Sequence, residues 1–115
     1  MAGAVLFGNS GADYLVINRG SQIEANGTAA NPIVMTSQAD LERRADNDPS
    51  NDDGGSNISE WGGLVILGRA PINRCRDAAT PGTAQCENII EGVTNPDAIY
   101  GGGLPNDNSG ILRYV

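Results

Sequence analysis

The stretch LVINRGSQIEANGTAANPIVMTS, residues 15–37, decides the fold class. It contains three short strand-like runs, and clusters of Gly, Asn and Ser, which favour turns, separate them. The apolar residues stand next to one another rather than alternating strictly, as in the strands of parallel sheets. Three such strands with their corners occupy roughly 20–25 residues, the length of one β-solenoid coil. We therefore predict that Leu15–Ser37 forms a first coil.

The rest of the chain repeats strand-like stretches between polar loops. We expect a second coil from Trp61–Asn73 together with Asn88–Gly92, and the first strand of a third coil at Gly110–Val115. The polar segments between these strands are expected to be insertions at the corners of the coils, and they cover residues 38–59, 74–87 and 93–109.

A helix is expected to be short or absent. The only stretch with helical features is SQADLERRAD, where Asp40 comes early and Arg43 and Arg44 come late, matching the helix dipole. The 16 glycines and the many Asn and Asp residues favour turns instead. The sequence thus predicts an all-β fold in which residues 1–115 form a single domain, a short parallel β-solenoid of about two to three coils with long polar corner loops.

The charge pattern excludes several classes of function. The net charge is −7, and all basic residues are Arg, because the chain has no Lys and no His. Such acidity argues against nucleic acid and against anionic membranes as partners. No apolar segment approaches the ~18 residues of a membrane span, and the first residues lack the features of a signal peptide. Without His or Lys, a His-activated serine nucleophile and a P-loop are also excluded.

Four stretches together carry a resemblance to a known family. They are ADYLVINRGSQIEANGTAANPIVMTS, EWGGLVILGRAPIN, IEG and YGGGLPNDNSGILRYV. They resemble large bacterial exported proteins that form a right-handed parallel β-helix of the pectin-lyase-like type. The resemblance implies that fold and a location outside the cytoplasm, often at the cell surface. It carries over no catalytic residues. Because members of the family are several times longer, we expect this chain to be an internal piece of a longer β-helix.

The exported resemblance implies a disulfide between Cys75 and Cys86, which lie in one polar loop. A metal pair is the alternative, but structural zinc requires four Cys or His ligands. A reduced pair remains open if the chain is made in the cytosol.

The acidic loop DNDPSNDDGGSN contains four carboxylates that are close enough in sequence to hold Ca²⁺. They are Asp46, Asp48, Asp52 and Asp53. Their spacing does not follow the EF-hand pattern, so a solvated acidic loop is the preferred interpretation. Asp107, in the turn PNDNSG, is a weaker candidate. We expect no cofactor other than such a Ca²⁺ ion.

Carbohydrate chemistry is the alternative to a non-catalytic role. Glycoside hydrolysis needs two carboxylates facing across a sugar, and Glu24, Glu60 and Glu91 each lie beside a strand. A polysaccharide lyase on this fold would use acids that bind Ca²⁺ and an Arg base, for which Arg113 is the candidate within a strand. Nothing in the spacing forces these groups together, so we expect no enzyme activity.

Two aromatic residues and the chain ends are the remaining candidates for binding. Trp61 and Tyr100 each stand beside a pair of glycines, where a ring could stack on a sugar or, as we prefer, fill a gap between loop and coil. Neither terminus resembles the polar cap that solenoids require. We therefore expect the chain to self-associate through the edge formed by Ile111, Leu112, Tyr114 and Val115.

Together these observations predict a non-catalytic structural or binding module of a secreted or cell-surface protein. Its expected partners are copies of itself, and a carbohydrate or a protein bound by its loops. The alternative is a carbohydrate-active enzyme that acts on acidic polysaccharide.

Overall fold

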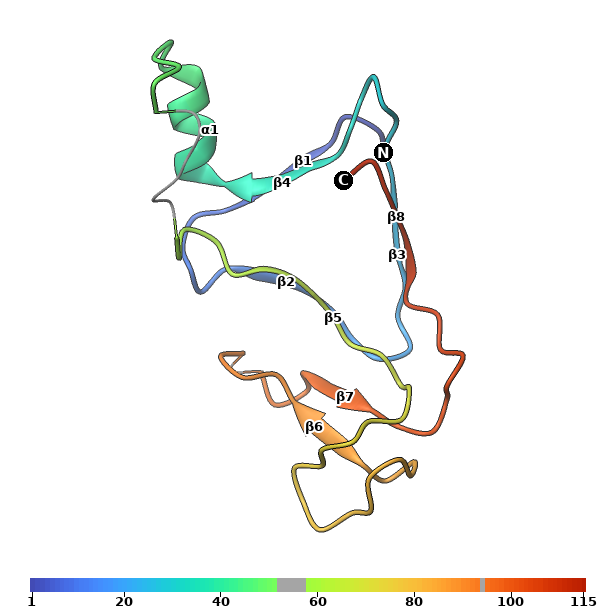
Figure 1. Ribbon diagram of the computed structural model, residues 1–115. Coiled ribbons are helices and arrows are strands. Elements are labelled where there is room, and N and C mark those ends of the chain that lie inside the picture. The colour runs from blue at the N-terminus through green and yellow to red at the C-terminus, as the bar shows by residue number, and fades with distance from the viewer. Residues whose placement is uncertain (52–57, 94) are drawn as a thin grey trace. The chain divides into compact units, whose positions relative to one another are not determined.

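The regular secondary structure of the chain consists mainly of short β-strands, which turns and irregular segments connect. A computed structural model describes residues 1–51, 58–93 and 95–115, and it contains one short helix among these residues (Figure 1). The predicted all-β class is therefore confirmed. The elements in chain order are β1 (Val5–Gly8), β2 (Tyr14–Ile17), β3 (Ile23–Asn26), β4 (Val34–Ser37), α1 (Gln38–Ala45), β5 (Gly63–Ile66), β6 (Glu87–Ile89), β7 (Ile99–Gly101) and β8 (Gly110–Arg113).

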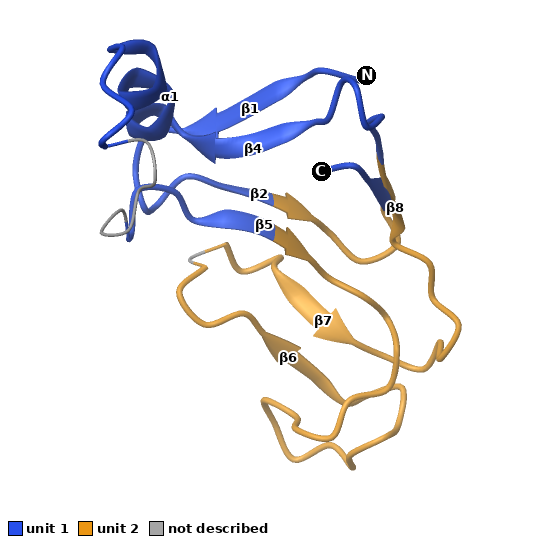
Figure 2. Cartoon of the chain, turned by 45° about the horizontal axis from the view of Figure 1, so that its top comes forward, with its two compact units in different colours: residues 1–15, 25–64, 112–115 blue, residues 16–24, 65–111 orange. Residues whose placement is uncertain are grey.

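The strands form two-stranded sheets in which the order of pairing follows the chain. Strand β1 pairs with β4, β2 pairs with β5, and β3 pairs with β8. The β1–β4 pair is parallel, with a register that runs from Val5 opposite Val34 to Gly8 opposite Ser37. Figure 2 shows β2 and β5 running in the same direction. The first three strands, β1, β2 and β3, thus pair with three later strands, β4, β5 and β8, in the same order along the chain.

The chain divides into two compact units. Unit 1 contains residues 1–15, 25–64 and 112–115, and unit 2 contains residues 16–24 and 65–111 (Figure 2). In unit 1 the Gly62 N–H donates to the Asp13 carbonyl at 2.8 Å, and in unit 2 the Leu67 N–H donates to the Ile17 carbonyl at 2.9 Å. Backbone bonds of this kind between distant segments hold each unit together.

Strands β6 and β7 depart from the predicted coil pattern. They pair in antiparallel fashion, with Glu87 opposite Gly101 and Ile89 opposite Ile99. The stretch Asn88–Gly92 was expected to belong to a second coil, and residues 93–109 were expected to be an insertion without a strand. The chain instead reverses direction at Asn95, whose side-chain oxygen accepts the Asp97 N–H at 2.9 Å. The connection from Ile89 to Ile99 is shorter than the roughly dozen residues that a parallel crossover requires, so the two strands pair in antiparallel fashion.

The short helix is confirmed at the start of the first polar insertion. Ser37 is its N-cap, and the Ser37 hydroxyl accepts the Asp40 N–H at 2.9 Å. Asp40 lies in the first turn and forms an ion pair with Arg44, four residues later, at 3.0 Å. The arrangement of charges along the helix thus matches its dipole.

Each unit buries few apolar side chains. Ala25 and Ile33 are buried in unit 1, and Leu67, Cys86 and Ala98 are buried in unit 2. Many large apolar side chains along the strands are exposed instead, and they include Val5, Leu6, Phe7, Val34, Ile66, Ile89, Ile111 and Leu112. The strands therefore present apolar surface that the described part of the chain does not cover.

The predicted disulfide is present. Cys75 and Cys86 are bonded, with their Cα atoms 4.9 Å apart, and Cys86 is fully buried. Cys86 immediately precedes β6, so the disulfide ties the polar loop to the start of this strand.

We expect the disulfide to stabilise the protein by restricting the unfolded chain. Replacing both cysteines in a Cys75→Ala/Cys86→Ala variant should lower the free energy of unfolding by about 3 kcal/mol, the entropic value for so short a loop. Urea titration followed by circular dichroism measures the change. An unchanged midpoint would contradict stabilisation through restriction of the unfolded chain.

A glycine at the start of β8 allows two chain segments to approach closely. Gly110 has a φ of 114°, and a Cβ added there would overlap the Ile23 carbonyl oxygen. Gly82 offers a matched control, because its φ is 82° but nothing lies within 4 Å of the added Cβ. Both positions thus have positive φ, but only Gly110, which lies in β8, also has a close backbone contact.

The two glycines should therefore differ in their response to substitution. We expect Gly82→Ala to lower the free energy of unfolding by about 1–2 kcal/mol, the cost of positive φ. Gly110→Ala should cost at least about 3 kcal/mol, because the backbone contact with Ile23 adds to that strain. Equal midpoints in urea would contradict the close contact.

Candidate functional site

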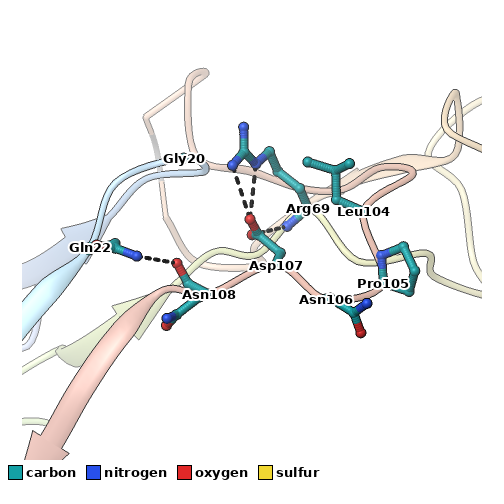
Figure 3. A pocket seen from close by; sticks show the side chains of 8 residues that line it. All are labelled: Gly20, Gln22, Arg69, Leu104, Pro105, Asn106, Asp107 and Asn108. Atoms are coloured by element: carbon teal, nitrogen blue, oxygen red, sulfur yellow. Dashed lines mark hydrogen bonds and ion pairs between the residues drawn. The ribbon is translucent and has the colours of Figure 1, made fainter.

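A surface hollow lies in unit 2 where three loop segments meet (Figure 3). It has a volume of about 570 Å³, and we call it the loop hollow. Its lining comes from the segment after β2, from Arg69 in the segment after β5, and from the segment before β8. The lining residues are Gly20, Gln22, Arg69, Leu104, Pro105, Asn106, Asp107 and Asn108.

An ion pair between Arg69 and Asp107 fixes the wall of the loop hollow. The Arg69 N–H donates to one Asp107 oxygen at 2.7 Å, and the guanidinium donates twice to the other oxygen at 3.1 Å (Figure 3). The Asp107 side chain is 6% exposed, whereas that of Arg69 is 45% exposed. The Arg69 backbone N–H, together with its guanidinium, lowers the pKa of Asp107. Asp107 is therefore a structural anion with both oxygens occupied.

The remaining polar groups of the loop hollow are amides. The Gln22 amide donates to the Asn108 carbonyl at 3.1 Å, and the Asn108 side-chain oxygen accepts the Gly110 N–H at 2.9 Å. Asn106 is exposed on the same rim. Amides and an ion pair in an open hollow suit a neutral polar ligand. Asp107, the weaker candidate for a metal ligand, binds Arg69 instead.

A second cluster of charges joins the helix to the segment before β5 in unit 1. The Arg43 guanidinium donates to both Glu60 oxygens at 3.0 Å, and the Ser37 hydroxyl donates to one of them at 2.7 Å. These bonds, above all those from Arg43, lower the pKa of Glu60. Glu60 also raises the pKa of Arg43. We call this cluster the helix clamp, since it ties α1 to the end of its own insertion.

The other predicted catalytic groups are distributed over the two units. Glu60 and Arg113 belong to unit 1, whereas Glu24 and Glu91 belong to unit 2. Glu24, Glu91 and Arg113 are exposed. Glu60 is held ionised by the helix clamp, so it does not suit the role of a general acid.

The acidic loop is described only in part, because Asp52 and Asp53 lie outside the described residues. Asp46 accepts hydrogen bonds from the Asp48 N–H at 2.7 Å and from the Asn51 amide at 2.9 Å. Asp48 accepts two bonds from Ser50. These bonds, led by those from the Asn51 and Ser50 side chains, lower the pKa of both Asp46 and Asp48. Across the described residues, no group of three or more acidic or sulfur ligands is arranged to hold a metal ion.

The two predicted stacking residues have different surroundings. Trp61 lies against Gly8, where an added Cβ would overlap the indole ring. It lines a hollow of about 210 Å³ in unit 1 together with Phe7 and Tyr14. This packing favours the gap-filling role. Tyr100 instead lines a hollow in unit 2 that also contains Arg74 and Arg76. Ligand stacking stays a prediction for both rings.

The predicted association edge is exposed. Ile111, Leu112, Tyr114 and Val115 each retain between 43% and 55% of their accessible surface. Self-association through them stays a prediction.

Sequence reasoning missed the long-range ion pairs. The Arg69–Asp107 bond joins residues 38 positions apart, and the bond from Arg19 to Glu87 joins residues 68 positions apart. Local patterns reveal only pairs such as Asp40 with Arg44, which are one helical turn apart. One feature of the sequence could have indicated such ion pairs. Every basic residue is Arg, and the planar guanidinium group of Arg is suited to bidentate pairing with a carboxylate.

The parallel β1–β4 pair, with a long connection between its strands, is consistent with a protein of the β-helix type. The model of one family, described as a pectate-lyase-like β-helix domain, matches residues 2–115. The chain belongs to this family, as its sequence resemblance indicated. Comparison with curated proteins and with solved structures found no match. In the part of the chain that the structure describes, no helix has the length and apolar character needed to cross a membrane.

The helix clamp should make stability depend on pH. Because the pKa of Glu60 is lowered by folding, its contribution is present above the ordinary glutamate value of 4.5 and is lost as the pH falls through the lowered pKa. We expect Glu60→Gln to be less stable than the wild type at pH 7. The difference in stability between the two proteins should become smaller as the pH falls. Urea midpoints at pH 7 and pH 3 measure this.

Glu42→Gln is the control, because Glu42 is exposed on the same helix and accepts a hydrogen bond from Gln38. Among the described residues it has no ion pair comparable with that of Glu60. If the difference in urea midpoint between the wild type and Glu60→Gln were the same at both pH values, the predicted stabilisation by ionised Glu60 would be wrong.

Proposed function

We propose that this chain is a non-catalytic structural and binding module of an exported β-helix protein. Strands β1, β2 and β3 would form one coil of a right-handed parallel β-helix, and β4, β5 and β8 the next. The segment Gly110–Val115, expected to open a third coil, would then belong to the second, because β8 pairs with β3. The family membership and the ordered strand pairing support this assignment. The disulfide supports a location outside the cytoplasm, where such bonds persist.

The observation that carries the proposal is the combination of unpaired strand edges with exposed apolar side chains. Among the described residues each sheet has two strands, so every strand has one edge without a strand partner. Val5, Leu6 and Phe7 are exposed on β1, and Ile111 and Leu112 are exposed on β8. Such edges are templates for pairing with another strand. A further coil, provided by a second copy of this chain, would satisfy both the backbone groups and the apolar surface.

The insertions would serve binding rather than coil formation. The helix clamp and the disulfide each fix an insertion at its base, and the loop hollow adds a polar surface in unit 2. The charge of −7 keeps these loops hydrated. A carbohydrate or a protein is the expected partner of the loops.

Self-association is tested by the mass of the protein in solution. Light scattering on a size-exclusion column should give a dimer or a larger species for the full chain. Leu112→Lys should shift the protein towards monomer, because it places a charge on the β8 edge. Leu104→Lys is the matched control, because Leu104 is 49% exposed and Leu112 is 48% exposed, but Leu104 lies in a loop. Leu104→Lys should keep the wild-type mass.

Two results would contradict the proposal. One is a monomeric wild type over the whole concentration range. The other is an equal effect of the two lysine substitutions, which would indicate non-specific apolar contact. Circular dichroism of each variant separates loss of association from loss of folding. Release of shortened products from polygalacturonate by the wild type would contradict the non-catalytic assignment.

A further inference from the structure

We propose that unit 2 contains a binding site for a small amphiphilic carboxylate, an anion with an apolar body. The site is separate from the loop hollow and from the strand edges that would mediate association. It consists of two hollows beside β6 and β7 that share Ile90 and Tyr100. One hollow supplies positive charge and the other supplies apolar surface.

The charged hollow has a volume of about 590 Å³ and contains two arginines. Arg74 forms no ion pair within the described part of the chain. Arg76 lies 3.6 Å from Glu87, but Arg19 also pairs with Glu87, so two guanidinium groups share one carboxylate. A carboxylate ligand would therefore find unmatched positive charge and donors with fork geometry. We call this space the arginine hollow.

The adjacent hollow has a volume of about 270 Å³ and an apolar lining. Three isoleucines, Ile66, Ile72 and Ile90, line it together with Tyr100. Ile66 is 40% exposed, so a ligand could remove apolar surface from water at this place. We call this space the apolar hollow. In the proposed binding mode the carboxylate lies in the arginine hollow, and the apolar body extends past Ile90 and Tyr100, which line both hollows, into the apolar one.

The backbone around the arginines is held in place. The Arg76 N–H donates to the Glu87 carbonyl at 2.8 Å, and the Asn88 amide donates to the Arg74 carbonyl at 3.1 Å. Cys75, between the two arginines, is bonded to Cys86 just before β6. Three attachments thus fix the arginine backbone beside the strand, which lowers the entropic cost of binding.

One group opposes the ligand. Glu91 is exposed and also lines the arginine hollow. Its charge is outweighed there by the two arginines, since Glu87 is shared with Arg19. Removing the Glu91 charge should therefore strengthen binding of the carboxylate. Glu91→Gln is thus a variant whose affinity should rise, whereas the arginine substitutions should lower it.

The test uses octanoate as the probe, with acetate, octanamide and galacturonate for comparison. Calorimetry gives the affinities, and chemical shifts of the ¹⁵N-labelled full chain locate the contacts. We expect octanoate to bind more tightly than all three, with shifts at residues 74–76, 88–91 and 100. Arg74→Gln/Arg76→Gln should weaken binding about tenfold or more. Glu91→Gln should strengthen it about threefold.

Arg113→Gln is the matched control, because Arg113 is also exposed but belongs to unit 1. It should leave the affinity within about twofold of the wild type. Chemical reduction of the disulfide should weaken binding, and the glutamine variants test the site even if the reduced protein unfolds. An octanoate affinity that the Arg74 and Arg76 substitutions do not change would overturn the proposal. If acetate or galacturonate bound as tightly as octanoate, the proposal that the ligand needs an apolar body would be wrong.

Discussion

Parallel pairing between short strands that are distant in sequence is the constraint on which the rest of the structure depends. A parallel pair needs a long connection, because the chain must return to the same end before the next strand starts. The backbone groups of β1 are satisfied only when the chain comes back at β4. The Gly27 N–H likewise reaches the Arg113 carbonyl at 2.8 Å. Everything between such partners is free to vary as long as its ends remain in register.

This freedom explains the insertions. The entropy of closing a loop grows slowly with its length, by about 0.6 kcal/mol for each doubling, so a long insertion costs little more than a short one. What an insertion needs is an anchor at its base. Arg43 and Glu60 provide it next to the helix, and the disulfide provides it in the polar loop before β6. The helix and the β6–β7 pair are therefore additions to the strand pairing rather than parts of it.

The sequence predicted what depends on neighbouring residues. Strand-like runs, turn clusters, a helix that is short at most and the pairing of the two cysteines could be predicted locally or by resemblance, whereas the Ser37 cap was found only in the structure. The antiparallel β6–β7 pair could not, because the apolar run near Ile89 is compatible with either strand direction. The Gly, Pro and Asn residues after Ile90 also did not reveal that a strand begins at Ile99, so soon after β6 that only an antiparallel return is possible. Ion pairs such as Arg69 with Asp107 were also inaccessible, since they depend on which loops the strands bring together.

The acidity of the chain and its exposed strands can be understood together. Unpaired edges with apolar side chains promote indiscriminate association, and a net charge of −7 opposes it by mutual repulsion. Only a contact that satisfies many backbone groups at once, as a matching coil does, yields enough stabilisation to overcome that repulsion.

The negative net charge also gives significance to the few arginines that are not fully neutralised by ion pairs. Arg74 and Arg76 flank a disulfide-bonded cysteine beside β6, so their positive charge is held at a defined place on a mainly negative chain. A local excess of fixed positive charge attracts anions there, whereas repulsion keeps anions away from most of the remaining surface.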